Sequence, residues 1–130
     1  MLEDELKFGD AFSHVMQVRY GAKMNIHVDV PEEKRDIQLP VLSLLPLLEN
    51  ATTHNMIDSE HIMNINISLD KHDVLLVSNP VYPKLTPPVT NGTGLKNLDV
   101  RFEMMMGRHI QAEKQGDKYV VKLPLGSRSE

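Results

Sequence analysis

Apolar residues recur along the chain with two different periods, which predict its helices and strands. Residues 3–20 carry apolar side chains three and four positions apart, the spacing of one face of an α-helix. The apolar positions of this helix are Phe8, Ala11, Phe12, Val15 and Met16. Gly21 is a typical stop, because glycine readily adopts the left-handed backbone that often follows a helix.

Strict alternation of apolar and polar residues predicts strands with one exposed face. Residues 23–30 alternate in this way and end at Pro31, which cannot donate to a sheet. Residues 63–69 also alternate, and a short turn leads from them to the unbroken apolar run 74–77. Because that run lacks alternation, we expect a central strand covered on both faces, paired with residues 63–69 in a hairpin.

Two further helices and a final hairpin complete the pattern. Residues 40–55 present a leucine stripe, and Pro46 within it requires either a start near Ser43 or a kink. The proline-rich residues 80–91 predict an irregular loop, and the helix that follows it is expected to end at about residue 106. Residues 110–114 and 119–125 are then expected to pair around the turn Gln115-Gly116-Asp117. The order predicts one sheet with three helices on one face, an α+β two-layer sandwich.

Composition places the chain among ordinary globular domains and argues against several functions. Its 130 residues suit one domain, with 41% hydrophobic and 25% charged residues. A formal net charge of -4 argues against a nucleic-acid partner, and the absence of cysteine excludes disulfides and thiolate metal sites. No apolar run approaches the roughly 20 residues that span a bilayer, so we expect no direct membrane contact by this chain.

The first candidate for chemistry is a polar cluster on the second predicted helix. Asn50, Thr53 and His54 lie at positions i, i+3 and i+4, beside Glu49 and opposite the leucine stripe. An amide oxygen next to a carboxylate suits Mg²⁺, which often shares its ligands with phosphates. Taken alone, however, the cluster is better explained as the solvated face of an amphipathic helix.

Two other polar motifs stand at the ends of predicted elements. One is Asn91-Gly92-Thr93-Gly94-Leu95, where two glycines allow close approach of backbone and a helix N-terminus attracts phosphate. The other is Ser78-Asn79-Pro80, whose side chains can read the edge of a ligand base at the end of a buried strand. A glycine-rich helix cap and an ordinary strand exit are the structural alternatives.

In combination and order, these motifs resemble those of the LytS-type sensor histidine kinases. Leu47-Leu48-Glu49-Asn50-Ala51 with His54, after Leu39-Pro40-Val41-Leu42-Ser43, resembles their N box. Gly92-Thr93-Gly94-Leu95-Lys96-Asn97-Leu98 and the residues up to Arg108 resemble their G2 box and the helix after it. Residues 3–21 resemble the segment before their catalytic domain, and residues 120–125 resemble their last strand.

The resemblance implies the GHKL, or Bergerat, fold, with a mixed and mainly antiparallel sheet and ATP on its helical side. Residues 1–22 would lead from a dimerisation and phosphoacceptor region, residues 23–126 would form the ATP-binding catalytic domain, and residues 127–130 would be a disordered tail. Asn50 would bind Mg²⁺ between the phosphates, and Glu49 would be the catalytic carboxylate that supports the metal or polarises the reacting group. Phosphate would be cradled by Gly92, Thr93, Gly94 and Leu95, under a lid formed by the loop 80–91.

The resemblance also implies partners and a location. Such kinases pass the γ-phosphate of ATP to a histidine on a separate dimerisation domain, and then to a response regulator, here of the LytTR type. The location would be cytoplasmic, with the parent protein anchored in the inner membrane. Family members carry the acceptor histidine in a His-Phe pair, which does not occur in this chain. We therefore expect that the chain does not phosphorylate itself. We also expect a monomer, because the dimerising helices of the family are mostly absent from this sequence.

The chain departs from the family pattern where the adenine is read. Ser78-Asn79-Pro80 stands in place of Asp-x-Gly-x-Gly, with Ser78 as the positional match and Asn79 able both to accept and to donate. Adjacent strand residues point to opposite faces, so only one of the two can serve. Thr53 replaces a basic residue, for which Lys84 or Lys96 can substitute. The alternative function is therefore a GHKL-fold signalling module with weak or no ATP binding.

Overall fold

The computed structural model describes residues 1–84 and 93–125 of the chain, and its elements follow the predicted order. The helices are α1 (Leu2–Tyr20), α2 (Leu45–Thr53) and α3 (Thr93–Met106), with short 3-10 turns at Gly21–Lys23 and Glu32–Lys34. The strands are β1 (Met24–Asp29), β2 (Met63–Leu69), β3 (Val74–Pro80), β4 (Gln111–Gln115) and β5 (Lys118–Pro124). Most of the predicted lid, Gly92 and the predicted disordered tail lie outside the described residues.

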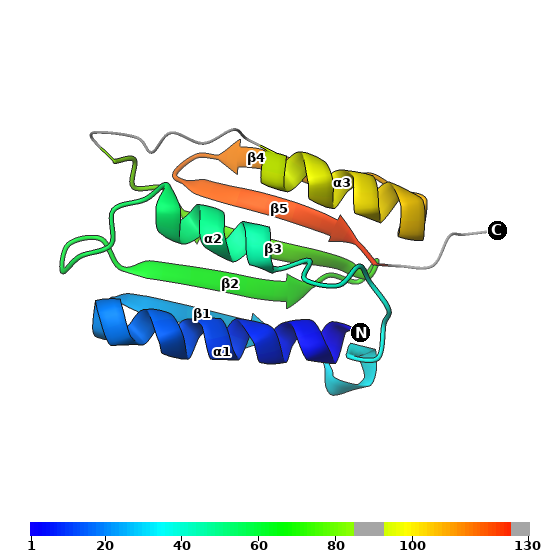
Figure 1. Ribbon diagram of the computed structural model, residues 1–130, viewed down its shortest axis with the longest axis horizontal. Coiled ribbons are helices and arrows are strands. Elements are labelled where there is room, and N and C mark those ends of the chain that lie inside the picture. The colour runs from blue at the N-terminus through cyan, green and yellow to red at the C-terminus, as the bar shows by residue number, and fades with distance from the viewer. Residues whose placement is uncertain (85–92, 126–130) are drawn as a thin grey trace.

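The strands form one five-stranded sheet in the order β1-β2-β3-β5-β4. β1 and β2 are parallel, and the other described neighbours are antiparallel. Figure 1 shows α1, α2 and α3 lying on the same face of this sheet. The predicted α+β sandwich, with a mixed and mainly antiparallel sheet under three helices, is therefore confirmed.

The hydrophobic core fills the space between the helices and the sheet. Met24 pairs with Met63 across β1 and β2, and Leu75 pairs with Leu123 across β3 and β5. All four side chains are buried, as is Phe102 of α3. Burial of each such side chain contributes about 1.5–3 kcal/mol, which explains why this face carries all three helices.

The buried face of α1 is rotated away from the predicted apolar stripe. Ala11 is exposed and Val15 is 63% exposed, so that part of the prediction is wrong. Gly9 and Ser13 face the core instead, although neither counts as apolar in a periodicity analysis. Gly9 lies beside Leu44, since a Cβ atom added to this glycine would be in ordinary contact with Leu44 Cδ1, at 3.8 Å.

Two expectations about β3 and α2 are also decided by the structure. β3 is central as predicted, but it is not covered on both faces: Leu75 is buried under the helices, whereas Val74 and Leu76 are half-buried. Val74 and Leu76 face away from the helices, where their partners on β5 are Pro124 and Lys122. α2 begins at Leu45, so Pro46 lies in the first turn, where its missing N–H costs little.

Candidate functional site

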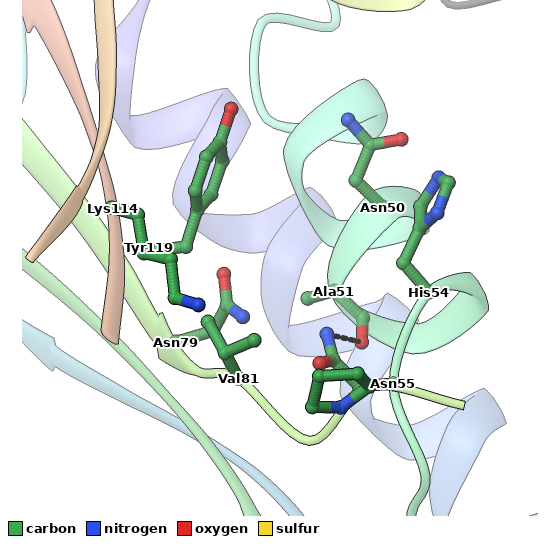
Figure 2. Close-up of a pocket in the computed structure, with 9 residues that line it drawn as sticks. Asn50, Ala51, His54, Asn55, Asn79, Val81, Lys114 and Tyr119 are labelled. Atoms are coloured by element: carbon green, nitrogen blue, oxygen red, sulfur yellow. Dashed lines mark hydrogen bonds between the residues drawn. The ribbon is translucent and has the colours of Figure 1, made fainter. Parts of the chain in front are cut away.

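A cavity of about 390 Å³ opens on the helical face of the sheet, between α2 and the ends of β3, β4 and β5. Its volume is in the range that small-molecule sites usually have. The residues that line it are Asn50, Ala51, His54, Asn55, Asn79, Val81, Pro83, Lys114 and Tyr119. Figure 2 shows the residues of α2 on one side of this space and those of the strands on the other.

The α2 wall of the cavity carries part of the predicted polar cluster. Asn50 and His54 are one turn apart, half-buried, and both line the cavity. Glu49 and Thr53, on other sides of the same helix, are exposed and are not among the lining residues. The structure therefore brings Asn50 and His54 to the cavity and leaves the carboxylate of Glu49 toward solvent.

The sheet wall is a row of three side chains in register. Asn79 of β3 is opposite Tyr119 of β5, which is in turn opposite Lys114 of β4. Asn79 is only 9% exposed, and its Nδ2 donates to the Pro80 carbonyl oxygen at 2.8 Å. That hydrogen bond fixes the amide, and Oδ1 remains as a neutral acceptor. Burial raises the pKa of the Tyr119 phenol above its ordinary value of 10.0.

Ser78 lies on the opposite face of the sheet from this row. Its partners across the neighbouring strands are Asn66 and Val120, and it does not line the cavity. Alternation along β3 is the reason, because Asn79 faces the helices and its neighbour must face away. Of the two candidates for reading a base, Asn79 is the one that the structure brings to the cavity.

Asn55 closes the end of the cavity by joining two segments of the chain. Its buried side chain donates from Nδ2 to the Ala51 carbonyl oxygen at 3.0 Å, the dashed line in Figure 2. Its Oδ1 accepts from the Tyr82 backbone nitrogen at 2.7 Å. Through these bonds the end of α2 holds the segment after β3, and with it the lining residues Val81 and Pro83.

The first turn of α3 packs against the first turn of α2. A Cβ atom added to the exposed Gly94 would lie 3.5 Å from Pro46 Cβ. Pro46 is one turn before Asn50, so the N-terminal end of α3 lies beside the helix that carries Asn50. Thr93 is the first residue of α3, while Leu95 packs against the core. Leu95, like the half-buried Lys84, is not a lining residue.

Sequence reasoning missed Asn55, Lys114 and Tyr119. The alternation of the last hairpin offers a weak signal, because Tyr119 shares a face with Val121 and Leu123. Its place beside Asn79 depends on the pairing of β3 with β5, which joins positions 40 residues apart. That register cannot be read from local periodicity.

Comparison with solved structures defines the class of fold. The catalytic domain of the histidine kinase ThkA is similar over 96% of this chain and 95% of its own, with a TM-score of 0.66 and 13% identity. The blue-light activated histidine kinase of Erythrobacter litoralis is similar over 92% of this chain and 41% of its own, with a TM-score of 0.52 and 14% identity. The fold is that of a histidine kinase catalytic domain.

Sequence comparison identifies the relatives. The chain is 27% identical over 133 residues to the sensor histidine kinase BtsS of Escherichia coli, covering 95% of this chain and 23% of the relative. It is 26% identical over 144 residues to the sensor protein LytS of Oceanobacillus iheyensis, covering 95% of this chain and 25% of the relative. No protein-family model matches the chain. Its homologues are BtsS and LytS-type sensor histidine kinases, and it spans a quarter or less of the length of these two.

Proposed function

We propose that this chain is the ATP-binding catalytic domain of a two-component sensor histidine kinase. It would transfer the γ-phosphate of ATP to a histidine on a separate domain, for relay to a response regulator. The observation that carries the proposal is the cavity between the Asn50 side of α2 and the row Asn79–Tyr119–Lys114. A fold shared with histidine kinase catalytic domains and homologous sensor kinases support it.

The base of the nucleotide is proposed to bind at the sheet wall. The Asn79 Oδ1 is a fixed acceptor, which matches the exocyclic amino group of adenine. Ala51, Val81 and the ring of Tyr119 supply apolar surface against which a flat base can pack. Asn79, rather than Ser78, then takes the place of the family's aspartate.

The phosphates are proposed to bind between Asn50 and the beginning of α3. A helix N-terminus offers unpaired N–H groups and the positive end of the helix dipole, both of which favour phosphate. Gly92, Thr93 and Gly94 are proposed to contribute backbone there, and Gly94 packs beside the turn that precedes Asn50. Lys114 supplies a cation at the cavity wall that the sequence pattern did not indicate.

The donor set at Asn50 fits a shared Mg²⁺ ion better than a metal held by protein alone. In the part of the chain that the structure describes, no group of three or more His, Asp or Glu side chains can hold a metal. An amide oxygen is a hard ligand, and Mg²⁺ characteristically takes few protein ligands and completes its shell with phosphates and water. When bound, Mg²⁺ would neutralise phosphate charge. Glu49 is next to Asn50 in the sequence but does not line the cavity, so it is proposed to support the metal without being a direct ligand.

The partners and location are proposals drawn from the relatives. The phosphoacceptor histidine is proposed to lie on a dimerisation domain of the parent kinase, and the response regulator is proposed to be of the LytTR type. None of the described helices is long and apolar enough to cross a membrane. A cytoplasmic location of this domain, with a membrane-anchored parent, is proposed from the sensor kinases that it resembles.

Titration calorimetry with a non-hydrolysable ATP analogue and Mg²⁺ tests the proposal. We expect binding in the micromolar to sub-millimolar range. The exposed asparagine Asn66, on the other face of the sheet, provides a matched control, and Asn66→Ala should bind as the wild type does. Absence of heat at millimolar nucleotide would instead support the alternative, a signalling module that has kept the fold without ATP binding.

A further inference from the structure

Glu5 of α1 is a charged side chain in the protein interior. It is 5% exposed, and among the described residues it is the one charged side chain that is buried. Its Oε2 accepts a hydrogen bond from the Leu42 backbone nitrogen at 2.9 Å, and its Oε1 accepts one from the Leu44 backbone nitrogen at 3.0 Å. These two hydrogen bonds stabilise the buried carboxylate, because burying a charge without partners would be very unfavourable.

The two hydrogen bonds hold the entry into α2. Leu44 is the N-cap residue of α2, and its own side chain makes no capping hydrogen bond. The Glu5 carboxylate brings a negative charge from another helix to this N-terminus, where free N–H groups and the helix dipole favour an anion. Leu42 has a φ of 57°, a left-handed conformation that leucine rarely adopts. The hydrogen bond that the Leu42 N–H donates to Glu5 stabilises that conformation.

The same end of α1 is tied to the segment that leads into α2. The Leu2 backbone nitrogen donates to the Ile37 carbonyl oxygen at 2.8 Å, and the Glu3 backbone nitrogen donates to the Arg35 carbonyl oxygen at 2.8 Å. Figure 1 shows this segment running from the beginning of α1 to the beginning of α2. The first turn of α1 and the start of α2 are therefore linked through both backbone and side chain.

We propose that Glu5 is a positioning residue that couples α1 to the nucleotide site. α2 has only nine residues, and it places Asn50, Ala51 and its C-cap residue His54 on the cavity wall. A helix of about two and a half turns moves as one body, so its first turn sets where Asn50 lies relative to the Asn79 row. Displacement of α1 that breaks the Glu5 bonds would lower nucleotide affinity. Only the expected loss of nucleotide affinity rests on the proposed function; the hold of Glu5 on α2 does not.

The test compares Glu5→Gln with Asp10→Asn, the same loss of charge in the same helix at a residue whose side chain is 76% exposed. Glutamine nearly keeps the volume of glutamate, but it loses the charge and turns an N–H₂ group toward one of the two backbone donors. At a temperature where both variants are folded, amide hydrogen exchange over residues 45–53 should be faster in Glu5→Gln, with β2 and β3 unchanged. Its affinity for the Mg²⁺–ATP analogue should fall about tenfold.

Each outcome bears on a separate claim. Faster exchange in α2 with unchanged nucleotide affinity would overturn the coupling and leave Glu5 with a structural role. Unchanged exchange in α2 would overturn its hold on that helix, whether or not nucleotide binds. If the wild type binds no nucleotide, the proposed function fails, while the exchange comparison still tests the hold of Glu5 on α2.

A measurement on the wild-type protein covers the case in which Glu5→Gln does not fold. Coupling between two sites is reciprocal, so nucleotide binding must strengthen the Glu5 bonds as much as those bonds strengthen binding. The Leu42 and Leu44 amides should then exchange more slowly when the Mg²⁺–ATP analogue is bound. Equal exchange of both amides with and without bound nucleotide would overturn the proposal.

Discussion

Asn79 and Tyr119 are cross-strand partners on β3 and β5, and both side chains line the cavity. Because the Asn79 amide is tied to the Pro80 carbonyl, it faces the cavity as an acceptor beside an aromatic ring. In the proposed nucleotide site, this pair would offer a base two of the contacts that purine recognition needs, an apolar surface and one directional polar group. In that proposal, asparagine would replace the family's aspartate without its charge.

The first prediction concerns selectivity between purines. Asn79→Leu keeps the approximate volume of the side chain but removes the acceptor for the adenine amino group. We expect ATP-analogue affinity to fall about tenfold or more, since the ligand amino group is left unpaired, and the preference for ATP over GTP to disappear. Competition titrations with the two nucleotides measure both effects, with Asn66→Leu as the control. A preserved preference for ATP would remove Asn79 from the base site.

The second prediction concerns the metal. Asn50→Ala should abolish Mg²⁺-dependent nucleotide binding, because the amide oxygen is the proposed protein ligand. The fold should persist, since Asn50 is half-buried at the cavity rather than packed in the core. Calorimetry with and without Mg²⁺, together with thermal unfolding, separates the two effects. Affinity that remains unchanged and Mg²⁺-dependent in this variant would contradict the role given to Asn50.

Much of the fold could be predicted from the sequence because the elements have strong local periods. The alternation in residues 23–30 and 63–69 depends only on which residues face the core, and it located β1 and β2 well. The buried face of α1 was predicted less well, because Gly9 and Ser13 face the core there. Gly9 lies beside Leu44, the residue before α2, and a contact between two such distant segments cannot be read from the period of one helix.

The candidate site could be predicted only in part, for a similar reason. Asn50 and His54 reach the cavity because helical spacing puts both on one face, which a sequence reveals directly. The choice between Ser78 and Asn79 depends on which face of β3 meets the helices. Lys114 joins the site only through the register of β4 with β5, fixed by contacts along the whole hairpin.

The third prediction concerns the stability of the cavity's end. Asn55→Ala removes the acceptor of the Tyr82 N–H and the donor to the Ala51 carbonyl in a buried position. Buried groups left unpaired cost about 1–3 kcal/mol, so the free energy of unfolding should fall by about that amount. Urea denaturation measures it, with the exposed Asn97→Ala as the control. A decrease in the free energy of unfolding no larger than that of the control would show that water replaces both hydrogen bonds.

The last prediction concerns pH. The hydrogen bond from His109 Nδ1 to the Asp99 carboxylate, at 3.0 Å, raises the pKa of His109 above its ordinary value of 6.5, and the charge of Glu103 adds to the effect. A raised pKa in the folded protein means that the charged imidazole stabilises the fold below the unfolded-state pKa. That contribution disappears as the pH rises through the higher folded-state pKa.

His109→Gln should therefore lower the melting temperature at about pH 6 and leave it nearly unchanged at about pH 8. Because His109 is on the surface, the difference should be small and should shrink in high salt. Asp99→Asn provides the matched variant: it keeps an acceptor for the Ile110 backbone nitrogen, which donates to Asp99 at 2.8 Å, but removes the charge. In that background, His109→Gln should have little further effect on the pH dependence, since the two residues act as a pair. A melting-temperature difference that is the same at both pH values, or larger at the alkaline one, would contradict the assignment.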